Sequence, residues 1–114
     1  MSICKGDWNL VLSDKVVFLG GGAGWIARNI AKTCYEHGAR IVLADFDVQK
    51  LNQVKKEIFP LETTDDRILL VEFDIENEET IEKAIEITVQ KWQTIHILIN
   101  SFVFIRLFTK RKRR

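Results

Sequence analysis

The sequence predicts an α/β domain in which helices cover both faces of a four-stranded parallel sheet. Short apolar runs alternate along the chain with longer segments whose apolar residues recur every three or four positions, the patterns of buried strands and of amphipathic helices. A strand that leads through a helix to a parallel neighbour makes a right-handed crossover. The alternation therefore predicts a doubly wound, three-layer sheet with the strand order 3-2-1-4.

The first strand is expected over residues 16–19, where four apolar residues stand together. Glycines at 20, 21, 22 and 24 end it, and a helix with one apolar stripe follows to about residue 37. Gly38 is placed to end this helix in a left-handed conformation. The second strand, over 40–45, follows at once and ends in Asp45.

A second helix is expected after Asp47, a good N-cap residue, and before Pro60, which cannot continue a helix. Its inward face should carry Val48, Leu51, Val54 and Ile58. A polar loop then leads to a third strand over 67–73.

The last expected pair is a long helix over 78–92 and a fourth strand over 95–100, which contains His96. Asn77 is the expected N-cap of the helix, and the acidic residues after it suit the positive helix start. The inward face of the helix is expected to hold Ile81, Ala84, Ile85, Thr88, Val89 and Trp92.

A glycine-rich turn between a strand and a helix is the setting in which dinucleotides bind. Glycines let the bare backbone approach a pyrophosphate, and the helix start favours the anion. Asp45 lies 21 positions after Gly24, where a carboxylate can accept hydrogen bonds from a ribose and would repel a 2′-phosphate. The alternatives are a tight turn that binds nothing and an Asp45 that serves only as a turn residue.

From residue 10 to residue 101 the chain resembles the short-chain dehydrogenase/reductase family, through motifs that end all four strands. These are the glycine turn, the segment Gly38-Ala-Arg-Ile-Val-Leu-Ala-Asp45, Phe73-Asp74-Ile75, and Ile97-Leu-Ile-Asn-Ser101. The resemblance implies a Rossmann-type fold and NAD(P)-dependent oxidoreduction, with NAD expected rather than NADP because of Asp45. The residues that it assigns to cofactor binding are Gly20, Gly21, Gly22, Gly24, Trp25, Ile26, Asp45, Phe46, Asp74, Ile75 and Asn100.

The sequence departs from the family pattern at several positions. These departures concern which branch of the family the chain resembles and whether the product is truncated. Gly20 replaces the usual threonine, and the spacing Gly21-x-x-Gly24-x-x-Ala27 is similar to the extended branch, which includes nucleotide-sugar epimerases. Ile97-Leu-Ile-Asn100 is instead similar to the standard branch, so the substrate class stays open. The family's Asn-Asn-Ala-Gly is here Asn100-Ser-Phe-Val, and nothing after it matches, so a truncated or frame-shifted product is expected.

No catalytic residue is expected in this chain. The family's Ser, Tyr and Lys would lie beyond its end, and the single tyrosine, Tyr35, is expected to pack on the first helix. His37 and His96 lack metal-binding partners. The chain is therefore predicted to bind a cofactor without transferring hydride alone. The alternatives are a non-catalytic nucleotide-binding or interaction module and a fragment of an epimerase- or dehydratase-like extended member.

Charge divides the chain into a domain over 1–105 and a basic tail over 106–114, expected to be disordered. Six of the 17 basic residues and no acidic residue lie in the tail, which leaves the preceding part with a net charge of −5. The tail could bind nucleic acid or lie along the acidic body, but a solvated end is favoured because no basic aromatic surface extends it. Neither an export signal nor an apolar run of about 18 residues is present, so a cytoplasmic protein without membrane contact is expected. An unpaired fourth strand would favour self-association.

Overall fold

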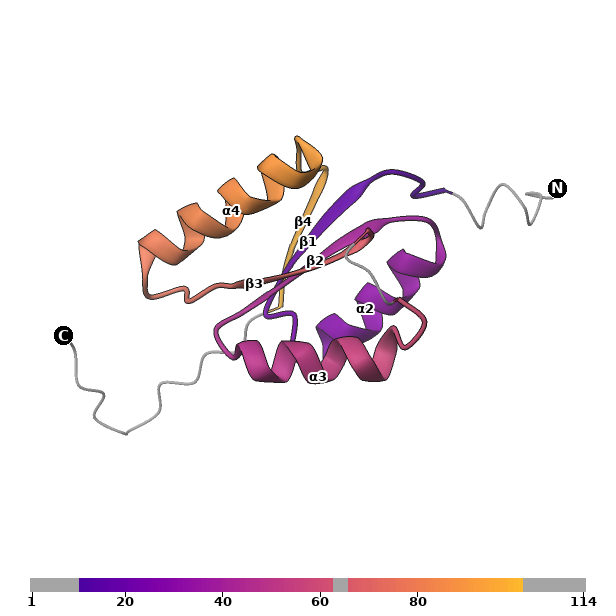
Figure 1. The fold of residues 1–114 in the computed structure, drawn as a ribbon, viewed down its shortest axis with the longest axis horizontal. Coiled ribbons are helices and arrows are strands. Elements are labelled where there is room, and N and C mark those ends of the chain that lie inside the picture. The colour runs from indigo at the N-terminus through magenta and orange to yellow at the C-terminus, as the bar shows by residue number, and fades with distance from the viewer. Residues whose placement is uncertain (1–10, 63–65, 102–114) are drawn as a thin grey trace, which may run out of the picture.

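The computed structural model describes residues 11–62 and 66–101. Its sheet contains β1 (Val16–Gly20), β2 (Arg40–Asp45), β3 (Ile68–Glu72) and β4 (Ile97–Asn100). All neighbouring strands are parallel, in the order β3-β2-β1-β4 (Figure 1), which confirms the predicted topology. The expected tail over 106–114, the domain boundary at 105 and the departures at Phe102 and Val103 lie outside the described residues.

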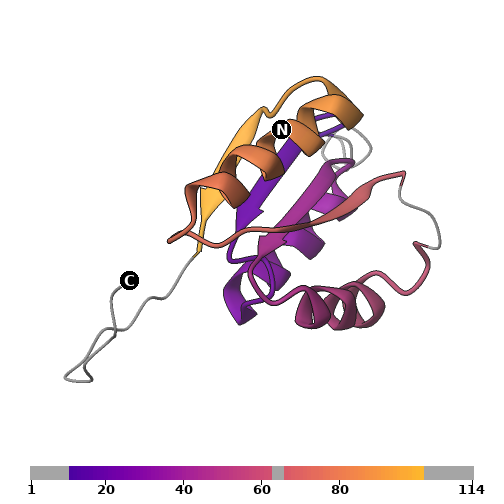
Figure 2. The same ribbon diagram turned by 60° about the vertical axis from the view of Figure 1, so that its left-hand side comes forward.

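Three helices of the described residues cover the two faces of the sheet. Helices α2 (Trp25–Glu36) and α3 (Val48–Ile58) lie side by side on one face, and α4 (Glu78–Trp92) lies on the other, as the two views in Figures 1 and 2 show. The expected three-layer arrangement is therefore confirmed. Each helix begins just beyond the carboxyl end of a strand, so all three helix starts gather at one edge of the sheet.

Alternation along the strands divides the core into two layers. In β1, Val17 and Leu19 face α2 and α3, whereas Val16 and Phe18 face α4. All four side chains are at most 1% exposed, so β1 is the buried centre of the domain. Phe18 meets Phe73 edge-to-face with ring centroids 5.4 Å apart. Because both faces are covered, this strand is a continuous apolar run.

The face under α4 is less completely covered than the helix pattern predicts. Ile85 and Val89, expected to face inward, remain 43% and 41% exposed, and Leu98 of β4 is 62% exposed. Among the described residues, β4 ends the sheet and α4 is the one helix on this face. The apolar stripe of α4 is therefore wider than the surface that the described sheet presents to it. Val48, also expected inward, is 41% exposed because it occupies the first position of α3, above the strand ends.

The helix ends follow the predicted chemistry. The side chain of Asp47 accepts a hydrogen bond from the Lys50 N–H (3.0 Å), and that of Asn77 accepts one from the Glu79 N–H (3.1 Å). Gly38 follows α2 with φ +98°, the left-handed region that glycine enters most easily. The N-cap of α2 is instead Gly24, which has no side chain to accept a hydrogen bond from the helix start.

The fourth strand is shorter than expected because His96 pairs with β1 through its side chain. Its Nδ1 accepts a hydrogen bond from the Val16 N–H (2.9 Å), while its own N–H donates to the Val16 carbonyl (2.9 Å). The imidazole thus takes the place of a backbone carbonyl, and the strand proper begins at Ile97. The strand begins two residues after the expected residue 95, and the prediction that His96 lies within it was wrong.

Candidate functional site

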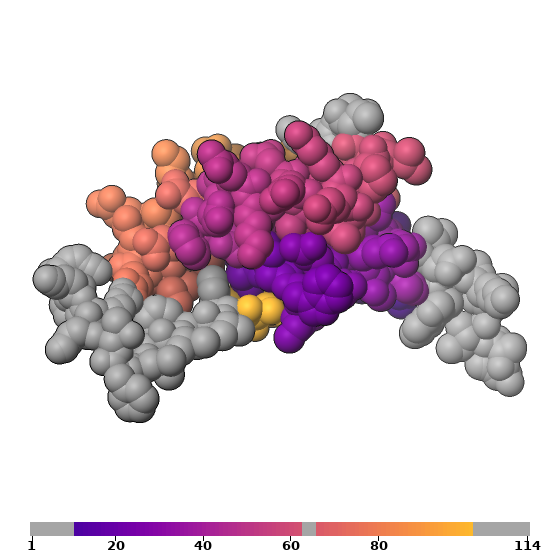
Figure 3. Space-filling model, turned by 90° about the horizontal axis from the view of Figure 1, so that it is seen from below, coloured from indigo at the N-terminus to yellow at the C-terminus, as the bar shows by residue number. Residues whose placement is uncertain are grey.

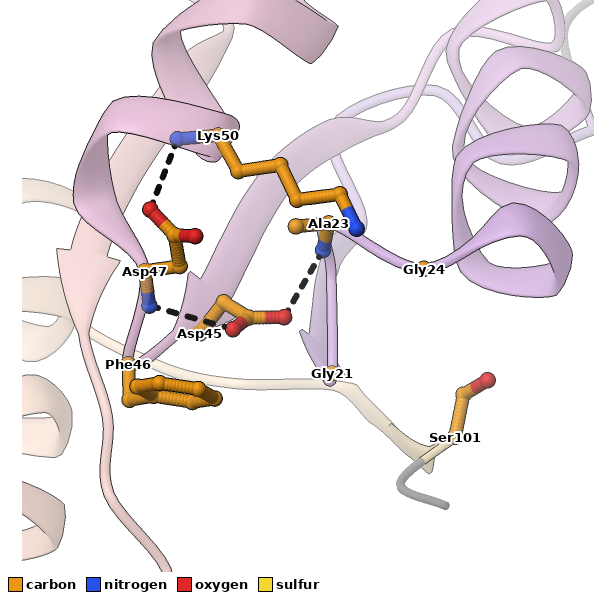
Figure 4. A pocket seen from close by; sticks show the side chains of 8 residues that line it. All are labelled: Gly21, Ala23, Gly24, Asp45, Phe46, Asp47, Lys50 and Ser101. Atoms are coloured by element: carbon orange, nitrogen blue, oxygen red, sulfur yellow. Dashed lines mark hydrogen bonds between the residues drawn. The ribbon is translucent and has the colours of Figure 1, made fainter.

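A pocket of about 250 Å³ opens at the carboxyl ends of β1 and β2 (Figure 4). From β1 the chain adds β2 and then β3 on one side of the sheet and afterwards adds β4 on the other side, so the strand order reverses at β1. In open α/β sheets such a switch point is where ligands bind. The pocket is lined by Gly21, Ala23, Gly24, Asp45, Phe46, Asp47, Lys50 and Ser101.

The glycine turn is fastened to the end of β2. The N–H groups of Gly21 and Gly22 both donate to the carbonyl of Ala44, at 2.8 and 2.9 Å. A Cβ added at Gly22 would lie 2.9 Å from the Cα of Leu43, closer than real Cβ atoms come to backbone. Gly22 is therefore required for the turn to pack on β2, and it lies behind the pocket wall.

The Asp45 carboxylate links the two loops that form the pocket. One oxygen accepts a hydrogen bond from the Ala23 N–H of the glycine turn (3.1 Å), and the other accepts one from the Asp47 N–H (3.2 Å), as Figure 4 shows. A carboxylate has about four acceptor positions, so these two bonds leave room to accept hydroxyl groups from a ligand. Asp45 is half-buried, and its place in the pocket wall points it toward such a ligand.

The start of α2 supplies donors beside this carboxylate. Hydrogen bonding at this helix start begins with the Arg28 N–H, which donates to the Gly24 carbonyl (3.0 Å). The preceding N–H groups in the first turn, those of Trp25, Ile26 and Ala27, have no carbonyl one turn earlier in the helix. With the positive end of the helix dipole, they favour an anion. The Trp25 side chain is 73% exposed and absent from the pocket wall, so the indole does not fill the pocket.

Three contacts hold this corner in place. The Arg28 guanidinium donates to the Ala23 carbonyl (3.3 Å) and pairs with Glu57 of α3 (3.3 Å), so the turn and both helices are linked. On the other side, the Ser101 N–H donates to the Gly20 carbonyl (2.8 Å). Figure 3 shows the resulting neighbourhood, with the end of β4 in yellow beside the start of α2 in indigo.

The structure gathers only part of the predicted set in this pocket. Gly21, Gly24, Asp45 and Phe46 line it, whereas Gly20 and Gly22 are buried and Trp25 and Ile26 are exposed on the first turn of α2.

Three predicted residues remain. Asp74 and Ile75 lie just after β3, and Asn100 is the last residue of β4. The Asp74 carboxylate accepts the Glu76 N–H (3.0 Å), Ile75 is 41% exposed, and Asn100 lines a separate apolar pocket under α4. They lie at the same sheet edge but outside the pocket that contains Asp45.

Sequence reasoning did not assign Ala23, Asp47, Lys50 or Ser101 to the site. Ala23 enters through its backbone N–H, and Asp47 was expected only as a helix cap. The pocket position of Lys50 could have been predicted from its place in the first turn of α3, because the helix starts lie together at this edge of the sheet.

Tyr35 lies in a different cluster. Its hydroxyl donates to Glu62, its ring meets Phe59 edge-to-face (4.8 Å), and the Arg67 guanidinium lies 3.9 Å from the ring centroid. Burial, followed by the bond to Glu62 and that carboxylate's charge, raises the pKa of Tyr35 above its ordinary value, against an opposing effect of Arg67. These contacts agree with the packing role expected for this residue.

The described ranges hold neither a metal-binding cluster nor a membrane-spanning helix. No group of three or more His, Cys, Asp or Glu side chains there is arranged to hold a metal ion. None of the described helices is long and apolar enough to cross a bilayer.

Comparison with known proteins gives a consistent result. The profile described as short chain dehydrogenase matches residues 15–105. The chain is 34% identical over 91 residues to the peroxisomal 2,4-dienoyl-CoA reductase of Danio rerio, covering 80% of this chain and 30% of that protein. It is 33% identical to an uncharacterized oxidoreductase of Staphylococcus aureus, covering 80% and 37%.

Solved structures agree with these relatives. A short chain dehydrogenase from Bacillus anthracis superposes with a TM-score of 0.70 at 35% identity, over 78% of this chain and 35% of that one. A 3-ketoacyl-(acyl-carrier-protein) reductase from Brucella melitensis, solved with NADH, gives 0.65 at 28% identity, over 75% and 33%. The chain thus spans about a third of the length of the proteins that it matches.

Proposed function

The chain belongs to the short-chain dehydrogenase family, whose members use NAD(P), and from this premise we propose that its described residues bind the adenosine half of that cofactor. The observation that carries the proposal is the Asp45 carboxylate, which lies in the pocket wall beside the glycine turn and the uncapped start of α2. In this arrangement the first-turn N–H groups of α2 would receive the pyrophosphate, and Asp45 would accept the ribose hydroxyls.

The residues present suit the adenosine end of such a ligand. The turn offers bare backbone at Gly21 and Gly24, and Phe46, which is 71% exposed in the pocket wall, offers an apolar ring next to the ribose position. We extend the proposal to Asp74, Ile75 and Asn100 on the adenine and second-ribose sides, because they end the neighbouring strands at the same edge. The bound cofactor would supply hydride chemistry at its nicotinamide ring.

We propose that NAD is preferred over NADP. A 2′-phosphate would bring negative charge next to the Asp45 carboxylate, and like charges at short range are unfavourable. We also propose that these residues bind the cofactor without transferring hydride themselves, since the one tyrosine is engaged with Glu62 and Phe59, in a cluster that shares no residue with the pocket wall. No side chain in the pocket wall is therefore assigned the proton transfer that hydride transfer requires.

Titration with NADH, followed by nicotinamide fluorescence, tests the proposal. Saturable binding is expected, with competition by ADP-ribose. Asp45→Ala should weaken it about tenfold, because a charged acceptor of ribose hydroxyls is lost. Asp45→Asn keeps an oxygen for the Ala23 N–H and serves to separate loss of the turn from loss of the ligand contact. The absence of saturable NADH binding by the folded wild-type chain would contradict the proposal.

A second proposal concerns the edge of the sheet. Among the described strands β4 pairs with β1 alone. Beside it lies an apolar pocket of about 200 Å³ lined by Phe18, Phe73, Ile81, Ile85, Ile95, Leu98 and Asn100. The strand carries no charged residue or proline of the kind that protects natural edges. We propose that a second copy of the chain pairs at this edge, which keeps the interaction-module alternative open beside cofactor binding.

A further inference from the structure

One basic side chain lies in the wall of the Asp45 pocket. Lys50 extends from the first turn of α3 toward the glycine turn at Ala23, as Figure 4 shows. The remaining charged side chains of the wall are the carboxylates of Asp45 and Asp47. The positive charge of Lys50 therefore reduces the electrostatic repulsion that the two carboxylates exert on a negatively charged group in this pocket.

The lysine is not committed to another partner among the described residues. The salt bridges there join Arg28 to Glu57 and Arg40 to Asp14, so the Lys50 ammonium lies within 4 Å of no described carboxylate. Its backbone N–H, by contrast, is held by the Asp47 cap (3.0 Å), which fixes the base of the side chain at the pocket rim. A lysine whose backbone is held in place and whose ammonium has no described partner is suited to contact a ligand.

The two charges act on the same part of an adenosine ligand. Asp45 ends β2 and Lys50 lies in the first turn of α3, and both side chains line the pocket in which the proposed ribose would lie. A 2′-phosphate there would be repelled by Asp45 and attracted by the ammonium. A ribose hydroxyl needs only the carboxylate, so the lysine affects the two ligands differently.

We propose that Lys50 is a specificity-determining residue, which contacts a 2′-phosphate on the adenosine ribose and lets the chain bind NADP with only a modest penalty relative to NAD. The inference rests on the proposed cofactor site and adds to it a second charge that opposes Asp45. Asp45 sets the preference for NAD, and Lys50 sets how strict that preference is.

The test measures four ligands on the whole chain. NADH and NADPH are titrated by fluorescence, and 5′-AMP and adenosine 2′,5′-bisphosphate are used as competitors that differ only in the 2′-phosphate. Lys50→Met removes the charge and keeps the apolar stem. Lys56→Met is the matched control, since Lys56 is an exposed lysine of the same helix that is absent from the Asp45 pocket wall.

Lys50→Met is expected to weaken binding of NADPH and of the bisphosphate about fivefold, the scale of one exposed charge-assisted contact, while NADH and 5′-AMP change less than about twofold. The fivefold difference should shrink as salt rises, because exposed charges are screened. Lys56→Met should leave the ratio of the two affinities unchanged. Far-UV circular dichroism of each variant verifies that the fold is kept.

Four results would overturn the inference. Equal weakening of all four ligands by Lys50→Met would show a general effect on the pocket. An equal shift from Lys56→Met would show that only net charge matters. If NADH and NADPH both bind and Lys50→Met leaves their ratio unchanged, the inference fails while the cofactor site stands; if neither binds the folded chain, both fail together.

Discussion

At the scale of single residues, Gly22 shows how one missing side chain sets the geometry of the site. Gly22→Ala should destabilise the fold by about 1–3 kcal/mol, because the new Cβ would meet the Cα of Leu43 and the N of Ala44 at 2.9–3.0 Å and backbone cannot easily move. Thermal unfolding by circular dichroism measures the change.

Gly24→Ala is the matched control for that substitution. Its Cβ would meet the Gly21 carbonyl oxygen at 3.3 Å, and its φ of −77° is accessible to alanine, so a loss below about 1 kcal/mol is expected. Equal losses for the two variants would contradict the packing role assigned to Gly22.

Tyr35 gives a second residue-scale prediction, in alkaline solution. Because its pKa is raised in the folded chain, the fold favours the neutral phenol. This stability is fully present below the unfolded pKa of about 10 and is lost as pH rises through the folded pKa. It is the only tyrosine in the sequence, so absorbance near 295 nm reports its ionisation alone.

The alkaline titration has a clear comparison. The phenol of the native chain should ionise at higher pH than the phenol of the chain unfolded in urea. Tyr35→Phe should remove the absorbance change and flatten the loss of stability above pH 10. Ionisation of the native chain at or below the pH found in urea would contradict the raised pKa.

At the scale of elements, Arg67 fastens the start of β3 to the rest of the domain. Its guanidinium donates to the carbonyl of Tyr35 at the end of α2 (2.6 Å) and to that of Ala39 before β2 (2.9 Å). Arg67→Met should cost about 2 kcal/mol, since the charge-assisted hydrogen bonds to both carbonyls are lost, although the Tyr35 carbonyl keeps the bond that it accepts from the Gly38 N–H (3.1 Å). Chemical denaturation measures the difference.

Arg40→Met is the control for the loss of an arginine. Arg40 pairs with Asp14 at 3.5 Å, where the two side chains are 37% and 80% exposed, so its removal should cost less than about 0.5 kcal/mol. If Arg67→Met cost no more than this, the link between the three elements would carry little energy.

The elements themselves were largely predictable from sequence, and the site was less so. Strands and helices follow from periodicity, and the Asp47 and Asn77 caps follow from residue type. The exposure of Ile85 and Val89 did not follow, because a helix pattern shows which side is apolar but not how wide a surface the sheet presents. Lys50 was missed for a related reason: its place in the pocket depends on where two helix starts meet.

At the scale of the whole molecule, the edge of β4 that pairs with no other described strand predicts concentration-dependent self-association. Leu98→Lys should shift the chain toward monomer in sedimentation velocity, because a charge on an edge strand opposes pairing and leaves the pocket under α4 less apolar. Leu61→Lys is the control, since Leu61 is 92% exposed and lies away from β4, in the turn after α3. A wild-type chain that stays monomeric at high concentration would contradict the prediction.

The pairing of β1 also determines when this domain can form during synthesis. Val17 pairs with Ile41 early in the chain, but its other neighbour is Ile97, eighty residues away. A ribosome must therefore deliver nearly the entire described sequence before the central strand is flanked on both sides. Until then β1 has an open side, and contacts so distant along the chain form slowly. The nascent polypeptide should consequently depend on chaperones in the interval before β4 emerges.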